Sequence, residues 1–321
     1  MSPLIASTIP SELSFTPHVV TSFAHELDKE PCFADAGLVD LFDSYPRASI
    51  EIMTMGSRLE DAVWRRGDPG DLSGSEILRA IAHGHLWVNI KHVHREHRVI
   101  AALVERLYDE VAAGTGEALP SWKASTLLVS SPTAFVEYHA DAVPNFLWHI
   151  RGRKRVWIYP AHEERYCPAA ILEDICTGHK PEGLPYDESL DAGAVCVDLE
   201  PGQVVSWPLN APHRVQNLEG LNVSLSTEHV TKATRKSLRV VRGNRVLRRA
   251  LGRRPTLERS GLAAGFKAGI GTIEHVFTKL TRRRATAFEW PMTFRVDPDA
   301  ALGYVDDARS QSVVSSGAGR A

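Results

Sequence analysis

The hydrophobic pattern of this chain changes twice along its length. Up to about residue 120, apolar positions recur three or four residues apart, as on one face of an amphipathic helix. In residues 94–114, Ile100, Leu103, Val104 and Leu107 share such a face, and Gly114 follows the expected end. Helices are also predicted just before Pro46 and after residue 72, and LWVNIKHV, residues 86–93, predicts a strand.

From about residue 125 the pattern becomes one of short β-branched and aromatic runs. Glycine, proline, asparagine and aspartate separate these runs, which is typical of an all-β sandwich or barrel. The sequence IRGRKRV predicts a hairpin with Gly152 in its turn. We expect a mainly β fold with flanking helices, whose core is an antiparallel double-stranded β-helix. The predicted strand runs are STLLVSS, AFVEYHAD, NFLWHI, KRVWIYP, AVCVDL, QVVSWPL and LNVSLSTEH.

After residue 231 helical patterns return, with some glycine interruptions, and the last residues are small and polar. We therefore expect four parts: a helical or mixed N-terminal region at 1–120, the β core at 121–232, a helical region at 233–305, and a disordered tail at 306–321.

Composition narrows the class of protein. The 321 residues suffice for a sizeable core, and no run of about 18 apolar residues predicts a membrane span. The N-terminus lacks the basic and apolar regions of a signal peptide. The four cysteines form no CxxC pair, so we expect free thiols and a cytoplasmic location; they are Cys32, Cys167, Cys176 and Cys196.

Three residues carry the candidate chemistry. His139 and Asp141 are two apart, so on an extended segment their side chains point to the same face. A second histidine, His213, comes after a strand that begins at a Pro-Gly turn. Two imidazoles and one carboxylate leave metal positions open, as Fe(II) oxygenases require. An HxD tripeptide alone is common, but here it lies between two predicted strands and is followed by the basic Lys154.

At this point the chain resembles a known family. HADAVPNFLWHIRGRKRVWIYP, residues 139–160, is similar to the iron-binding segment of JmjC-type hydroxylases, the asparaginyl-hydroxylase branch in particular. That family has an asparagine, a turn glycine, a lysine and a final proline after HxD, where this chain has Asn145, Gly152, Lys154 and Pro160. PGQVVSWPLNAPHRVQN, residues 201–217, is similar to its Gly, apolar strand, Pro and His segment.

The resemblance implies a jelly-roll, cupin/JmjC-like core with Fe(II), the co-substrate 2-oxoglutarate and O₂. It also implies the roles of the residues. His139, Asp141 and His213 would bind iron, and Lys154 would pair with the distal carboxylate of 2-oxoglutarate. Asn145, Ser224 and Ser226 would contact the co-substrate, and Trp87 would match an upstream aromatic contact. The chain departs from the family at Val136, where some relatives have threonine, and at Gln203, where many have an acid.

Other residues compete for these roles. Arg151, Arg153 or Arg155 could anchor the co-substrate, although strand alternation places Lys154 on the face opposite Arg155. His149 is an alternative ligand. The cluster of His92, His94 and His97 resembles a metal site, but its charged neighbours favour a solvated face.

The segment from Lys232 to Arg254 has ten basic residues and no acidic one. We interpret it as a solvated helix face that packs against acidic stretches such as 182–200. A footprint for RNA or an acidic protein is the alternative, with RNA disfavoured because no aromatic residues interleave with the charges. The resemblance implies a homodimer through the C-terminal helices.

The predicted function is an Fe(II)- and 2-oxoglutarate-dependent dioxygenase that hydroxylates a C–H bond of an unidentified substrate: a protein side chain, a nucleic-acid base or a small molecule. The alternative is a non-catalytic cupin-like protein, a metal-binding sensor or scaffold. A cupin isomerase or epimerase is disfavoured, because no fourth ligand or separate acid–base pair is evident.

Overall fold

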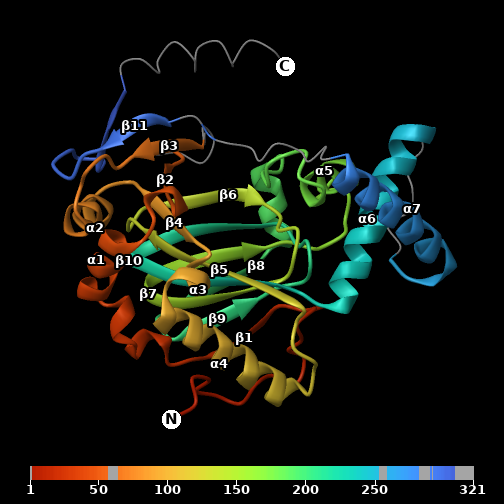
Figure 1. Ribbon diagram of the computed structural model, residues 1–321, viewed down its shortest axis with the longest axis horizontal. Helices are drawn as coiled ribbons and strands as arrows, with labels where there is room; N and C mark the ends of the chain where they lie inside the picture. The colour runs from red at the N-terminus through yellow and green to blue at the C-terminus, as the bar shows by residue number, and fades with distance from the viewer. Residues whose placement is uncertain (1, 57–63, 253–258, 282–289, 291, 308–321) are drawn as a thin grey trace.

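The computed structural model describes residues 2–56, 64–252, 259–281, 290 and 292–307. Strands and helices alternate irregularly in the first third, strands dominate the middle, and two long helices follow (Figure 1). The strands are β1 Thr21–Ala24, β2 Ile50–Thr54, β3 Arg65–Asp68, β4 Trp87–Lys91, β5 Trp122–Ser130, β6 Phe135–His139, β7 Asn145–Ile158, β8 Val195–Leu199, β9 Gln203–Ser206, β10 His213–Val230, β11 Met292–Val296 and β12 Tyr304–Asp306. The helices are α1 Asp35–Ser44, α2 Gly74–His83, α3 Val93–Glu96, α4 Arg98–Thr115, α5 Ala169–Cys176, α6 Lys232–Leu251 and α7 Gly261–Leu280, with short 3₁₀ turns at Leu27–Lys29, Pro31–Phe33, Arg47–Ser49 and Glu188–Gly193.

Two long bent strands, β7 and β10, build the core as a double-stranded β-helix. Residues 145–151 of β7 and residues 222–230 of β10 belong to a large sheet. Its strand order is β1-β9-β7-β10-β5-β4-β2-β3-β11-β12. The other halves of β7 and β10 pair with β6 and β8 in a smaller sheet. The core is therefore a jelly roll with one large and one small sheet, as expected from the density of short strands.

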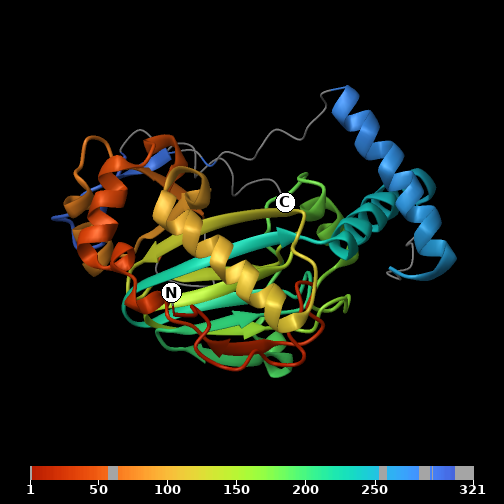
Figure 2. The same cartoon turned by 60° about the horizontal axis from the view of Figure 1, so that its bottom comes forward.

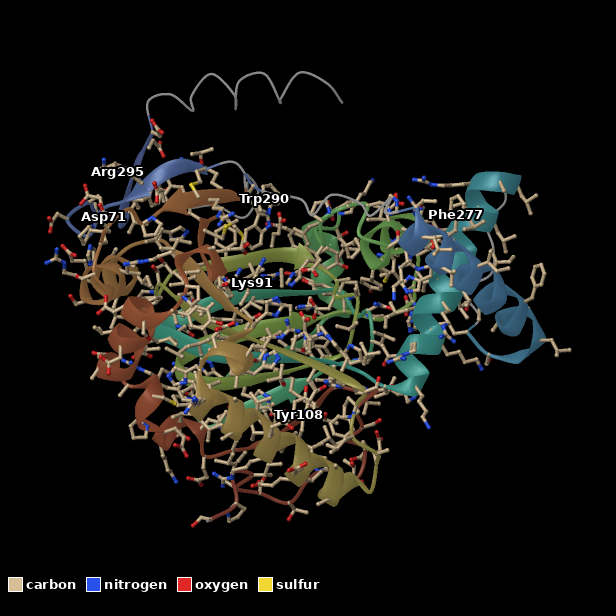
Figure 3. All side chains as sticks on the ribbon, in the orientation of Figure 1. Asp71, Lys91, Tyr108, Phe277, Trp290 and Arg295 are labelled. Carbon is tan, nitrogen blue, oxygen red and sulfur yellow. The ribbon has the colours of Figure 1, made fainter. Side chains whose placement is uncertain are left out.

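Three apolar clusters correspond to the faces of these sheets. The outer face of the large sheet, with Phe146 and Trp148, packs against α4, where Tyr108 and Leu107 are buried (Figure 3). A second cluster lies between the sheets, and a third covers the outer face of the small sheet under α5. The alternation of side chains along β7 separates the first cluster from the second.

The predicted hairpin at Gly152 is wrong, because β7 runs without interruption through this residue. Gly152 has a φ of +78° and lies against Gly220 of β10, whose φ is +69°. The pairing of the two strands shifts register at this point. A left-handed residue in a strand gives the same local signal as a hairpin turn, but here the two glycines bend both strands from one sheet into the other.

Replacing Gly152 with alanine should lower the free energy of unfolding by about 1–3 kcal/mol. The left-handed backbone costs an L-residue about 1–2 kcal/mol, and the added Cβ would lie 2.7 Å from Asn222 Nδ2. Gly70→Ala is the matched control, because its φ is +54° but its Cβ would meet nothing within 4 Å. Urea denaturation of both variants separates backbone strain from crowding. Equal losses in the free energy of unfolding would contradict crowding by Asn222.

The N-terminal region at 1–120, expected to be helical or mixed, contains strands as well as helices. Strands β1 to β4 of the N-terminal part join the large sheet, and β11 and β12 return to its far edge from the C-terminal part. The region 233–305 is therefore not wholly helical. The predicted helices are confirmed: Ser73 caps α2, whereas α4 extends past Gly114 to a left-handed cap at Gly116. Of the tail 306–321, only 306 and 307 are described.

Helices α6 and α7 form a hairpin that projects from the end of the sheets (Figure 2). Glycines bring the helices close: a Cβ on Gly243 would lie 2.0 Å from Lys267 O. Four basic side chains of α6 bind carboxylates of α5 and α7, not of residues 182–200 as expected; the pairs are Arg242–Glu274, Arg245–Asp174, Arg248–Glu173 and Arg249–Asp174. In the described ranges, no helix is apolar over a length that could cross a membrane.

Candidate metal centre and active-site cavity

The fold brings His139, Asp141 and His213 together. The ladder between β6 and β10 places His139 directly opposite His213, and Asp141 follows two residues after the end of β6. A shift in register between these strands aims His139 inward. One ligand atom from each residue lies within 4.8 Å of the other two, and in the described part of the chain this is the one such group of three.

Hydrogen bonds set the tautomer of both histidines. His139 Nδ1 lies 2.7 Å from Glu137 O, and His213 Nδ1 lies 3.1 Å from Ala211 O. Carbonyl oxygens only accept, so each Nδ1 carries a proton and each Nε2 presents a lone pair to the centre. Burial and the nearby His139 lower the pKa of His213 well below its usual value. The imidazole is therefore neutral, which is the form that binds a metal.

Asp141 completes a donor set that suits a divalent cation. Its Oδ2 atom lies 3.6 Å from His213 Nε2 and accepts a hydrogen bond from Asn145 Nδ2. Burial first, and then the charges of Glu182 and Glu228, raise the pKa of Asp141 well above its usual value. A buried carboxylate in such surroundings favours a nearby cation. Two imidazoles and one carboxylate fit Fe(II) and leave coordination positions open.

The centre lies in a cavity of about 1390 Å³ between the sheets, which also contains Lys154. The side chain of Lys154 is 1% exposed, and its Nζ lies 5.5 Å from the centroid of the Trp87 ring. Burial lowers the pKa of this lysine to about 7. No carboxylate of the described residues forms an ion pair with it, so the cavity holds a buried cationic group that an anion would stabilise.

The other predicted co-substrate residues lie in two places. Asn145 and Ser226 line the cavity, and Asn145 Oδ1 is buried without a hydrogen-bond partner. Ser224 is fully buried, lies 3.0 Å from His149 Nδ1 and is not brought to the cavity wall. Trp87 lines the cavity, and its Nε1 donates to Asn89 Oδ1 at 2.7 Å.

The competing residues lie elsewhere. The side chains of Arg151, Arg153 and Arg155 form ion pairs on the outside of the core, so of these four basic residues Lys154 is the one at the cavity. The Nε2 atom of His149 lies 2.9 Å from Gly152 O, where it bridges the bend of β7.

The three upstream histidines do not converge on a centre. His97 Nδ1 accepts from Ile100 N at the start of α4, and His94 Nδ1 lies 2.9 Å from Ser125 Oγ. His92 is exposed and lines the cavity, as does its neighbour Lys91, which Figure 3 labels.

Three residues near the centre were missed from the sequence. Glu228 lines the cavity, and burial and Glu182 raise its pKa to about 7. The sequence could have indicated Glu228, because it lies two residues after Ser226 and side chains two apart on a strand share a face. The ring of Trp207 lies 4.4 Å from that of His213. Asn210 binds the backbone of Asp141, and a lone asparagine between prolines gives no local signal for such a contact.

Neither a protein-family model nor a curated protein matches this chain. Among solved structures it is similar to the ribosomal oxygenase YcfD from Escherichia coli, with 14% identity over 86% of this chain and 69% of that chain, at a TM-score of 0.45. It is also similar to YcfD in complex with cobalt and 2-oxoglutarate, with 16% identity over 83% of this chain and 66% of that chain, at a TM-score of 0.43. Oxalate decarboxylase from Lactobacillus farciminis matches over 34% of this chain and 24% of its own, with 16% identity and a TM-score of 0.23. In another match to YcfD the chain spans 64% of that protein.

Proposed function

We propose that this protein is an Fe(II)- and 2-oxoglutarate-dependent dioxygenase that hydroxylates a C–H bond of its substrate. The observation that carries the proposal is one cavity with two complementary features. It contains a His139–Asp141–His213 donor set and, on a neighbouring strand, the buried and unpaired ammonium of Lys154. A dicarboxylate that chelates a metal at one end and needs a cation at the other matches both.

Each residue has a distinct task in this proposal. His139, Asp141 and His213 would hold Fe(II), and Asn145 would orient the Asp141 carboxylate through its hydrogen bond. The chemistry that Fe(II) supplies in such a site is the O₂-dependent oxidation of 2-oxoglutarate to succinate and CO₂, coupled to hydroxylation of the substrate. Lys154 would bind the distal carboxylate, and the apolar residues around it would exclude water and strengthen this ion pair.

An anaerobic titration tests the proposal. Protein loaded with Fe(II) is titrated with 2-oxoglutarate, and the visible absorption is followed for the weak charge-transfer band that bidentate chelation produces. We expect the band to appear in a saturable way. Iron-loaded protein without the band would contradict the dioxygenase and would favour the alternative, a metal-binding sensor or scaffold.

The cavity has room for more than the co-substrate. Its volume of about 1390 Å³ exceeds the roughly 300–1,000 Å³ of a typical small-molecule pocket. The side chains of Trp122, Lys91, Arg242 and Lys279 also line it and give it both aromatic and charged walls. These dimensions are compatible with a segment of a protein or nucleic acid as substrate, as well as with a small molecule.

We also propose that α7 is the site where a second copy of the chain docks. The helix packs on α6 through Ala264, Lys267 and Gly271, and its other side exposes large apolar residues (Figure 3 labels Phe277). Contiguous exposed apolar surface of this kind marks an interaction site. The exposed fractions are 95% for Leu262, 67% for Phe266, 73% for Ile273, 48% for Val276, 57% for Phe277 and 78% for Leu280.

Replacing Ile273 with glutamate should convert the dimer to a monomer, because a charge would be buried without a partner in the middle of the interface. Size-exclusion chromatography with light scattering measures the mass. Val195→Glu is the matched control, since Val195 is 53% exposed on β8, away from α7. A wild-type protein that is monomeric at micromolar concentration would contradict the proposed interface.

A further inference from the structure

Asn210 connects the two chain segments that carry the candidate ligands. It lies in the turn between β9 and β10, three residues before His213. Its Nδ2 atom donates a hydrogen bond of 2.7 Å to the backbone oxygen of Asp141. The side chain is 3% exposed, and the residue has a φ of +64°. Asparagine tolerates this left-handed conformation better than most residues, so the position combines a backbone need with a side-chain contact.

Arg259 holds the other end of the Asn210 amide. Its Nη1 atom donates to Asn210 Oδ1 at 3.0 Å and to Ser237 Oγ of α6 at 2.8 Å. Arg259 lies two residues before the start of α7. Because a guanidinium only donates, it requires an oxygen at this end of the amide and so turns the Nδ2 group toward Asp141. A continuous chain of hydrogen bonds therefore runs from Ser237 through Arg259 and Asn210 to Asp141.

We infer that Asn210 and Arg259 are positioning residues for the metal centre, through which the α6–α7 hairpin fixes the Asp141 ligand segment against the His213 segment. The side chains of both residues lie behind the ligands, so they act on the metal only through Asp141. Partners behind a metal ligand typically change metal affinity about 10- to 100-fold. The inference rests on the metal site proposed above and adds that the C-terminal helices are part of its support.

Metal binding by the full chain tests this inference. Anaerobic titration with Mn(II), followed by the loss of its free-ion EPR signal, gives the dissociation constant without requiring turnover. Asn210→Gly keeps the left-handed backbone accessible and removes the amide, and we expect it to weaken binding at least tenfold. Arg259→Met should give a smaller loss. The double variant should bind no more weakly than Asn210→Gly, because both changes break one chain.

Arg248→Ala is the matched control. It breaks the ion pair between α6 and Glu173 of α5, and so loosens the attachment of the same hairpin to the core without touching Asn210. It should lower the thermal midpoint of the metal-free protein and leave Mn(II) affinity within twofold of the wild type. Asn210→Gly affinity within twofold of the wild type, or equal losses in Asn210→Gly and Arg248→Ala, would overturn the inference. Wild-type protein that binds no Mn(II) would instead contradict the metal site itself.

Discussion

Asp141→Ala protein should form no succinate from 2-oxoglutarate and should bind Fe(II) more than about 100-fold more weakly than the wild type. Changing a group behind a ligand already costs about 10- to 100-fold in metal affinity, and Asp141 is the one anionic donor of the set. His139→Ala should have the same effect on turnover. Succinate is measured by mass spectrometry, and binding by anaerobic titration.

Thermal unfolding separates loss of the metal from misfolding. A ligand that binds the native state alone raises its stability by RT ln(1 + [L]/Kd), so added metal should raise the midpoint of the wild type and not that of Asp141→Ala. Burial and two nearby carboxylates disfavour the ionised Asp141 in the metal-free protein. Removing it should therefore not lower the midpoint without metal. Retained succinate formation in a variant with native stability would contradict the assignment of Asp141.

The convergence of His139, Asp141 and His213 could be predicted because the local pattern of the sequence coincides with the tertiary one. His139 and Asp141 are two apart at the end of a strand, and that spacing suffices to put them on one side. His213 was added because it follows a strand that begins at a Pro-Gly turn and because its segment resembles the JmjC-type family, and the structure places it opposite His139. Alternation along β7 likewise distinguished Lys154, which faces the cavity, from Arg155, which pairs with Asp198 on the surface.

What the sequence did not predict depends on contacts between distant segments. Gly152 has the same local signature in a hairpin and in a bent strand, and only its approach to Gly220 decides between them. Asn210 reaches Asp141 across 69 residues, and Arg259 reaches Asn210 across 49. The edge strands β11 and β12 are short, and they join the sheet beside β3 from the other end of the chain. Periodicity carries no information on such pairings.

The second large effect is expected at Lys154. Lys154→Met should weaken 2-oxoglutarate binding at least about 30-fold, because truncating one partner of a buried charge pair costs about 2–5 kcal/mol or more. The metal-free variant should be no less stable than the wild type, since methionine replaces an ammonium that is buried without a carboxylate partner. Arg155→Met is the matched control: its side chain faces the surface, and the charge-transfer titration should give the wild-type dissociation constant.

The pH dependence of binding distinguishes the charge of Lys154 from its shape. With a pKa of about 7 in the free protein, Lys154 is protonated below pH 7 and must take up a proton on binding above it. The dissociation constant for 2-oxoglutarate should therefore be level below pH 7 and rise about tenfold per pH unit above it. Glu228, also with a pKa of about 7, gains negative charge over the same range and would weaken anion binding too. Glu228→Gln should keep most of the rise, and Lys154→Met should leave only the smaller part that comes from Glu228. The reverse result would transfer the effect to Glu228 and leave Lys154 without its proposed role.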